Sequence, residues 1–280
     1  MGGKHTPDDR GAWCDIRTEG AFCLPMAYRY THRMGTRAVA LPLLVTLAVL
    51  TTLLSGCTGS GGTVEHYGRM RTVLHEGKSE PRVALAEVVA KPHAYAVGAL
   101  AGLRGEVTIL DGKATISRVR EGTLHSGPPE ANDWATLLTV AHIDRWQSAT
   151  LDHDVVDTDL ERAVRDIAAT TGVDVTRPFA FVIEGELTAL DMHVINRACP
   201  AAAGRGEDDG PHAPWRLHLG VPTKATLVGF YAQGREGEMT HHGTNAHIHA
   251  LLDHNGSTIT GHVETVAVTA GATVRVPDAR

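Results

Sequence analysis

The sequence has few of the features that mark several common classes of protein. Only four of its 280 residues are cysteine, which is too few for a disulfide scaffold in a chain of this length. Its 26 basic residues are outnumbered by 32 acidic ones, which argues against a nucleic-acid-binding surface. It contains neither the G-x-S-x-G motif of serine hydrolases nor a glycine-rich phosphate-binding loop. Hydrophobic residues make up 42%, enough for a folded core, and the 17 histidines indicate metal binding or proton transfer.

The N-terminal part of the chain indicates a targeting segment followed by a tether. An apolar run without charged side chains occupies residues 38–54 and ends in the tetrapeptide LSGC, which resembles the lipobox of bacterial lipoproteins. We therefore expect a lipid on Cys57 and a location on the extracytoplasmic side of the bacterial cell envelope. An uncleaved membrane anchor is the alternative. The expected segments are an over-extended gene start at 1–33, a signal peptide at 34–57 and a flexible tether at 58–65.

The body of the chain, residues 66–280, predicts an α+β domain with many strands and few helices. Helices are expected at 81–91 and at 157–171, the latter capped by Asp157 or Asp159. Its apolar stripe would consist of Leu160, Val164 and Ile167. The sequences GEVTILD and GELTALD, eighty residues apart, favour two similar sheet units, mixed or antiparallel, with a boundary near 175–215.

A histidine-rich hairpin carries the strongest chemical signal. His247 and His249 are two residues apart on an apolar strand, so they share one face. Asn255-Gly256 is a preferred pair for a tight hairpin turn, and with that turn the numbers of opposing residues sum to 511. His249 would then oppose His262, and His247 would oppose Glu264.

Three imidazoles on rigid strands suit a divalent metal with an open coordination position, the pattern of catalytic zinc sites. Glu264 would orient a ligand ring or bind the metal directly. The alternative is a polar strand face in solvent on which the histidines are scattered. His241, His242 and His254 are expected to be exposed loop residues.

The pattern H-x-H, a turn and then G-H-V resembles the metal site of the alpha-acetolactate decarboxylases, and also the plant-and-prokaryote-conserved domain of the same superfamily. The interval from His249 to His262 is nearer that of the small domain. Three further segments resemble the decarboxylases in order and spacing, over roughly residues 95–270. They are GEVTILDG at 105–112, FVIEG at 181–185 followed by Arg197, and TLVGFY at 226–231.

The resemblance implies an acetolactate-decarboxylase-like fold and a zinc enzyme that converts 2-acetolactate to acetoin. The Zn²⁺ ligands would be His247, His249 and His262. Glu106 would be the active-site acid, with a pKa raised by burial, and Arg197 would face the substrate. The family supplies a further glutamate from a C-terminal tail, whereas this chain has 18 residues after His262. Either Glu264 or Glu186 would replace that glutamate, or the step that it serves would be weakened.

The implied partner is a small 2-hydroxy-3-keto acid, and a homodimer is left open. The alternative function is a non-catalytic metal- or small-ligand-binding lipoprotein on the same scaffold.

Overall fold

The computed structural model describes residues 62–197 and 210–280, which form two antiparallel β-sheets with few helices. The first sheet has the order β1-β7-β3-β4-β5-β6, with β2 also paired to β7. Its strands are β1 (Glu65–Tyr67), β2 (Val83–Ala84), β3 (Ala94–Leu100), β4 (Glu106–Leu110), β5 (Lys113–Arg120), β6 (Thr123–Gly127) and β7 (Trp134–His142).

The second sheet has the order β8-β15-β10-β12-β13-β14-β9, and β11 pairs with β10. Because β10 also pairs with β14, strands β10, β12, β13 and β14 form a closed ring. The strands are β8 (Trp146–Thr150), β9 (Val155–Val156), β10 (Phe179–Val194), β11 (Trp215–Leu219), β12 (Thr223–Tyr231), β13 (Ala246–His254), β14 (Ser257–Val268) and β15 (Thr273–Pro277).

The long strand β10 makes this ring possible. Its first half, Phe179–Leu187, pairs with β12, and its second half pairs with β14 and β11. Its apolar residues fall into two runs, at 179–185 and 192–195. The polar residues between them interrupt the apolar pattern, because this part of the strand has an exposed face.

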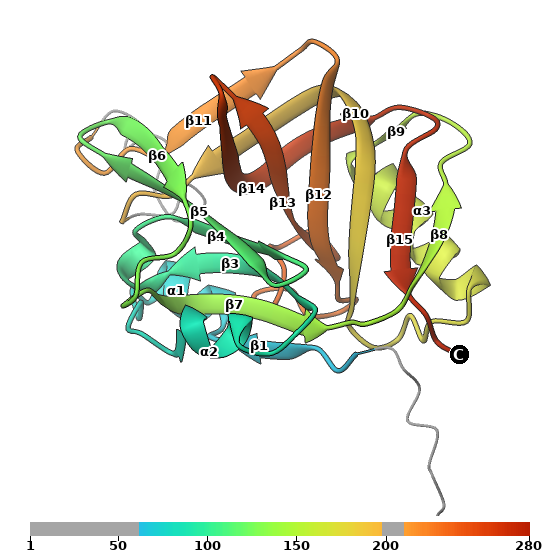
Figure 1. The fold of residues 1–280 in the computed structure, drawn as a ribbon, viewed down its shortest axis with the longest axis horizontal. Helices are drawn as coiled ribbons and strands as arrows, with labels where there is room; N and C mark the ends of the chain where they lie inside the picture. Colours follow the sequence, from blue (N-terminus) through green and yellow to red (C-terminus); the bar gives the residue numbers. More distant parts are fainter. Residues whose placement is uncertain (1–61, 198–209) are drawn as a thin grey trace, which may run out of the picture. The chain divides into compact units, whose positions relative to one another are not determined.

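The boundary between the sheet units predicted near 175–215 is wrong. The chain passes from the first sheet to the second between His142 and Trp146, because β8 already pairs with β15. The predicted boundary cannot lie there, because β10 and β11 both belong to the second sheet and pair with each other. Figure 1 shows the first sheet in cyan and green, and the second sheet in yellow to red except for β8 and β9, which are yellow-green.

Three α-helices and one short 3-10 helix, Ala101–Leu103, complete the described fold. The helices are α1 (Met70–His75), α2 (Leu85–Val89) and α3 (Asp157–Thr170). The sequence predicted α3 closely, and its buried face contains Leu160 and Val164. Neither predicted aspartate caps α3: the N-cap is Val156, and the Asp157 carboxylate instead accepts a hydrogen bond from the backbone N–H of Val266.

The helix predicted at 81–91 is shorter than expected, because Val83 and Ala84 pair with β7 before α2 begins. No helix within the described residues is long and apolar enough to span a membrane. The apolar run 38–54 and Cys57 lie outside the described residues.

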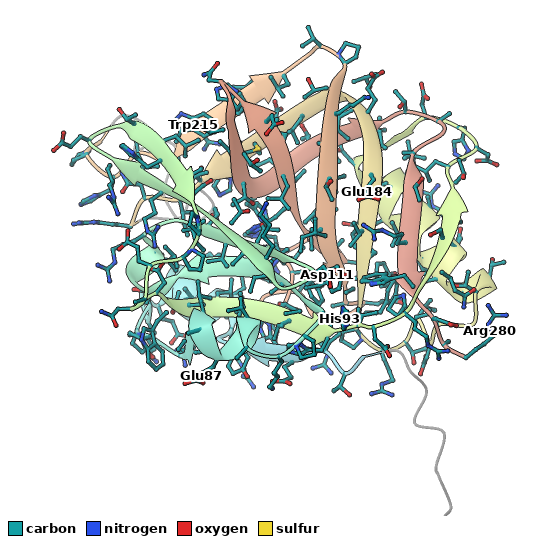
Figure 2. The ribbon with its side chains drawn as sticks, in the orientation of Figure 1. Glu87, His93, Asp111, Glu184, Trp215 and Arg280 are labelled. Carbon is teal, nitrogen blue, oxygen red and sulfur yellow. The ribbon has the colours of Figure 1, made fainter. Side chains whose placement is uncertain are left out.

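The two sheets meet through an apolar layer that places β3 and β7 against β10, β12 and β13. Buried residues of this layer include Tyr95, Ile143, Val182 and Phe230. On the opposite face of β12, Gly229 is required, because a Cβ at this position would overlap the ring of Phe181 in the other hydrophobic cluster of the second sheet. Polar side chains on the outer surfaces, such as Glu87 and Glu184, are exposed (Figure 2).

Candidate metal centre

Three imidazoles converge on the second sheet, as the sequence predicted. His249 on β13 lies directly opposite His262 on β14, and the turn between the strands is Asn255-Gly256, with φ of 52° and 78°. A two-residue hairpin turn of type I′ requires a positive φ at both of its residues. The ligand atoms of His247, His249 and His262 lie within 4.8 Å of one another, and all three side chains could bind one metal ion.

The predicted pairing of His247 with Glu264 is wrong. After His262, strand β14 leaves β13 and pairs with β10: Val263 lies opposite Met192 and Thr265 opposite Asp191. Glu264 is the extra residue of a β-bulge between these two pairs. The Glu264 carboxylate contacts His193 and Arg216, and the strand partner of His247 is Phe230 on β12.

His249 is held by the first sheet. Its Nδ1 lies 3.0 Å from the hydroxyl of Thr108 on β4, and that hydroxyl lies 2.5 Å from the hydroxyl of Thr260 on β14. The backbone N–H of Thr260 in turn donates to Ser117 on β5, at 2.9 Å. These buried contacts fix the orientation of the ring and leave Nε2 for the metal centre.

The donor atoms of this cluster fit a metal ion. Nδ1 of His247 and Nε2 of His249 are buried and have no hydrogen-bond partner among the described residues. A buried nitrogen without a partner is costly, and a divalent cation would satisfy it. Burial lowers the pKa of His249 to about 3, and it also holds the pKa values of His247 and His262 well below 6.5. The rings are therefore neutral at pH 7, the form that binds metals.

Glu106 supplies a carboxyl group from the first sheet, as the sequence predicted for an active-site acid. Its Oε2 lies 3.7 Å from Nε2 of His249, and its Oε1 accepts a long hydrogen bond of 3.4 Å from the backbone N–H of Ile195. Burial raises its pKa to about 8, while the Ile195 bond opposes this rise. The carboxyl group is thus protonated at neutral pH in the absence of a metal.

Two further histidines join the cluster, and sequence reasoning missed both. His193 on β10 lies directly opposite His262, and their ring centroids are 5.1 Å apart. His241, expected to be an exposed loop residue, is largely buried: its ring centroid lies 4.8 Å from that of His262 and 6.3 Å from that of His247. Burial lowers its pKa to about 4.

The Glu264 carboxylate contacts two residues on neighbouring strands, His193 on β10 and Arg216 on β11. Nδ1 of His193 lies 2.9 Å from Oε1 of Glu264, at hydrogen-bond distance but with poor alignment. The same carboxylate oxygen accepts from Nη1 of Arg216 on β11, also at 2.9 Å. The contacts with His193 and Arg216 lower the pKa of Glu264 to about 2, so this carboxylate is ionised. Glu264 therefore orients His193, which is not one of the three predicted ligands.

A cavity of about 450 Å³ opens onto this cluster from the second sheet. Its lining includes His193, His241 and His262 together with Glu264 and Arg216. Among the described lining residues, His262 is the only one of the three metal-site histidines, so a small organic acid entering the cavity would meet the group at His262. The cavity therefore provides an approach to the metal centre.

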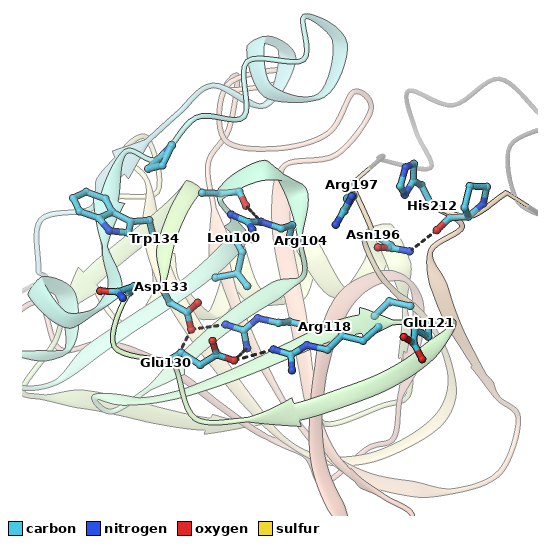
Figure 3. Close-up of a pocket in the computed structure, with 16 residues that line it drawn as sticks. Leu100, Arg104, Arg118, Glu121, Glu130, Asp133, Trp134, Asn196, Arg197 and His212 are labelled. Carbon is cyan, nitrogen blue, oxygen red and sulfur yellow. Dashed lines mark hydrogen bonds and ion pairs between the residues drawn. The ribbon is translucent and has the colours of Figure 1, made fainter.

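The structure does not bring Arg197 or Glu186 to this cluster. Arg197 is exposed and lines a different cavity, of about 690 Å³, with Arg104 and Arg118 (Figure 3). The described residues that line this cavity do not include His247, His249 or His262. The backbone N–H of Arg197 donates to the carbonyl of Leu103, with φ of 69° at Arg197. Glu186 is exposed and lies opposite Lys224 on β12, seven residues before His193 on the same strand.

The fold is that of the alpha-acetolactate decarboxylases. Two such enzymes, from Bacillus subtilis strain 168 and from Bacillus subtilis subspecies spizizenii, superpose with TM-scores of 0.57 at 15% and 16% identity; each match covers 76% of this chain and 85% of the other. A Staphylococcus aureus protein of unknown function, described as similar to alpha-acetolactate decarboxylase, gives a TM-score of 0.54 at 15% identity, covering 77% and 85%. No protein-family model matches the sequence, and neither does any curated protein.

Proposed function

We propose that this protein is a metal-dependent lyase that decarboxylates 2-acetolactate, or a close 2-hydroxy-3-keto acid, to the corresponding hydroxyketone. One observation carries the proposal: a buried carboxyl group, Glu106, lies 3.7 Å from the free nitrogen of His249 within a three-histidine centre on this fold. A metal site that only stabilised the fold would not need a buried carboxyl group beside it. Zinc is the proposed metal, because three histidines with an open position suit it.

The reaction requires a place for negative charge and a source of a proton. The bond between the carboxylate carbon and the neighbouring carbon breaks, carbon dioxide leaves, and the electron pair moves toward the ketone oxygen. A divalent cation bound by the three histidines would stabilise this charge as a Lewis acid. Glu106, a carboxyl group whose pKa burial raises, would then donate a proton to the carbon that lost the carboxylate. Solvent returns the proton to Glu106 after product release.

The second candidate function is a non-catalytic metal- or small-ligand-binding protein on the same scaffold. The position of Arg197 favours it, because the guanidinium expected to face the substrate lines another cavity. The buried acid beside the histidines favours the enzyme.

The test combines metal analysis with an assay for acetoin. Purified full-length protein loaded with Zn²⁺ should hold about one metal per chain and release acetoin from 2-acetolactate. Glu106→Gln should keep the metal and lose at least about 100-fold in rate, the typical contribution of a general acid. The control is Glu186→Gln, an exposed carboxylate on β10, which should leave the rate unchanged. Bound zinc without turnover would leave only the binding protein.

We also propose that the protein is attached to the extracytoplasmic face of a bacterial membrane by a lipid on Cys57. The LSGC tetrapeptide after an apolar run supports this location. Cys57→Ala should release the protein from the membrane fraction. A homodimer remains a further proposal, and light scattering of the purified protein would establish the oligomeric state.

A further inference from the structure

A row of nitrogen-bearing side chains crosses four neighbouring strands of the second sheet. Arg216 on β11 lies opposite His193 on β10, His193 lies opposite His262 on β14, and His262 lies opposite His249 on β13. Directly opposing residues of antiparallel strands have neighbouring side chains. The row therefore leads from the metal centre toward Arg216. Its two middle residues, His193 and His262, line the cavity.

His193 is the one histidine of this row whose role the metal centre does not explain. Its side chain is only 6% exposed, and it does not belong to the group of nitrogens that could share one metal. It lines the cavity beside His262. A buried imidazole in such a place needs a partner for each ring nitrogen.

The orientation of His193 follows from Glu264. Nδ1 lies 2.9 Å from Oε1 of Glu264, and a lone pair of Nδ1 facing a carboxylate at this distance would be repelled. Nδ1 therefore carries the hydrogen, and in the neutral ring Nε2 carries a lone pair. Arg216, bound to the same carboxylate oxygen at 2.9 Å, keeps Glu264 in place.

We propose that His193 recognises the hydroxyl group of a 2-hydroxy acid bound in this cavity, accepting its hydrogen bond on Nε2. Glu264 and Arg216 are positioning residues, which act by fixing the His193 tautomer. This inference rests on the proposed function for the class of ligand, but not on turnover. It makes the site selective for 2-hydroxy acids over analogues that lack the hydroxyl group, because those leave a buried acceptor without a partner.

The test compares two acids of nearly equal shape, 2-hydroxy-2-methylpropanoate and 2,2-dimethylpropanoate, which has a methyl group in place of the hydroxyl. Their dissociation constants are measured by calorimetry on the zinc-loaded full-length protein. The metal itself favours the hydroxy acid in every variant, so the change in preference between variants reports on His193. His193→Phe should reduce the preference about 10- to 100-fold, and His193→Gln, which retains an acceptor, should restore part of it.

Two variants separate positioning from a general structural effect. Glu264→Leu removes the carboxylate and should reduce the preference about 3- to 10-fold with bound zinc unchanged. The matched control is His218→Phe, because His218 forms a similar imidazole–carboxylate contact, 2.7 Å from Asp191, on the exposed surface. It should leave the preference unchanged.

A parallel arm measures decarboxylation of 2-acetolactate and of 2-methyl-3-oxobutanoate, which lacks the hydroxyl group. If neither acid turns over but His193→Phe still reduces the binding preference, the proposed function fails and this inference stands. If turnover occurs and the preference stays within twofold in His193→Phe, the inference is overturned. Loss of zinc from His193→Phe would overturn it as well, since His193 would then be a metal ligand. The inference would also be overturned if the wild-type protein bound neither probe acid.

Discussion

The buried carboxyl group of Glu106 should make the metal-free protein less stable as the pH rises. Burial raises its pKa from an ordinary 4.5 to about 8, so the native state binds the proton more tightly than the unfolded chain does. The contribution of Glu106 to the free energy of unfolding is therefore complete below pH 4.5 and is lost as the pH rises through 8. Each pH unit in this interval is worth about 1.4 kcal/mol, which gives a loss of about 3 kcal/mol at pH 7 and about 5 kcal/mol above pH 9.

Glu106→Gln replaces this group with a neutral one of the same shape and should remove the loss. The free energy of unfolding of both proteins is measured by urea denaturation after metal removal, at pH 5, 7 and 9. The variant should exceed the wild type by about 1 kcal/mol at pH 5, about 3 at pH 7 and about 5 at pH 9. Other ionisable groups are common to both proteins and cancel in the difference.

The matched control is Glu186→Gln, whose carboxylate is exposed on β10. It should change the free energy of unfolding by less than about 0.5 kcal/mol at each pH. A Glu106→Gln difference that is constant between pH 5 and pH 9 would refute the reasoning, because it would show that Glu106 titrates alike in native and unfolded chains. A stabilised but inactive Glu106→Gln variant would identify a residue retained for chemistry at the expense of stability.

Three further outcomes follow from the histidine cluster. His249→Ala should lower bound zinc from about one per chain to a trace by elemental analysis, whereas the exposed His242→Ala should retain it; equal zinc in both would exclude the proposed site. Thr108→Val removes the hydroxyl beside Nδ1 of His249 and should lower the affinity for zinc about 10- to 100-fold, measured in competition with a chelator. An unchanged affinity would show that this contact does not affect zinc binding. Burial lowers the pKa of His249 from 6.5 in the unfolded chain to about 3 in the folded protein. The contribution of the neutral ring to the free energy of unfolding is therefore complete above pH 6.5 and is lost as the pH falls toward 3. In the metal-free Glu106→Gln background, where the opposite effect of Glu106 is absent, urea denaturation should therefore show a loss between pH 7 and pH 5 of more than about 2 kcal/mol. His249 contributes about 2 kcal/mol, and His247 and His262, whose pKa values are also lowered, add to it; no loss would mean that these rings are already accessible to protons.

Most of the strands were predictable, and the exceptions have identifiable causes. Strands β4, β5 and β13 show clear apolar patterns that local reasoning recognises. Strand β3, with the sequence AYAVGAL, is buried on both faces and rich in small residues, so it lacks the alternation that marks a half-buried strand. Two-residue elements such as β2 and β9 contain too few residues for any pattern.

The metal-site hairpin was determined by the sequence itself. An alternating strand fixes which face His247 and His249 share, and a two-residue turn with positive φ fixes the register that brings His262 opposite His249. These are local relations, because all the residues lie within one hairpin. The same reasoning failed at Glu264, since a bulge shifted the register by one residue after the point where β14 changes partner.

Only the tertiary structure decided which residues surround this hairpin. Thr108 reaches His249 from a strand 141 positions earlier in the chain, and Glu106 approaches the same ring from the first sheet. His193 and Arg216 enter through pairings of β10 with two different strands. Such long-range contacts depend on which strand edges meet when the two sheets close, and no local periodicity records that choice.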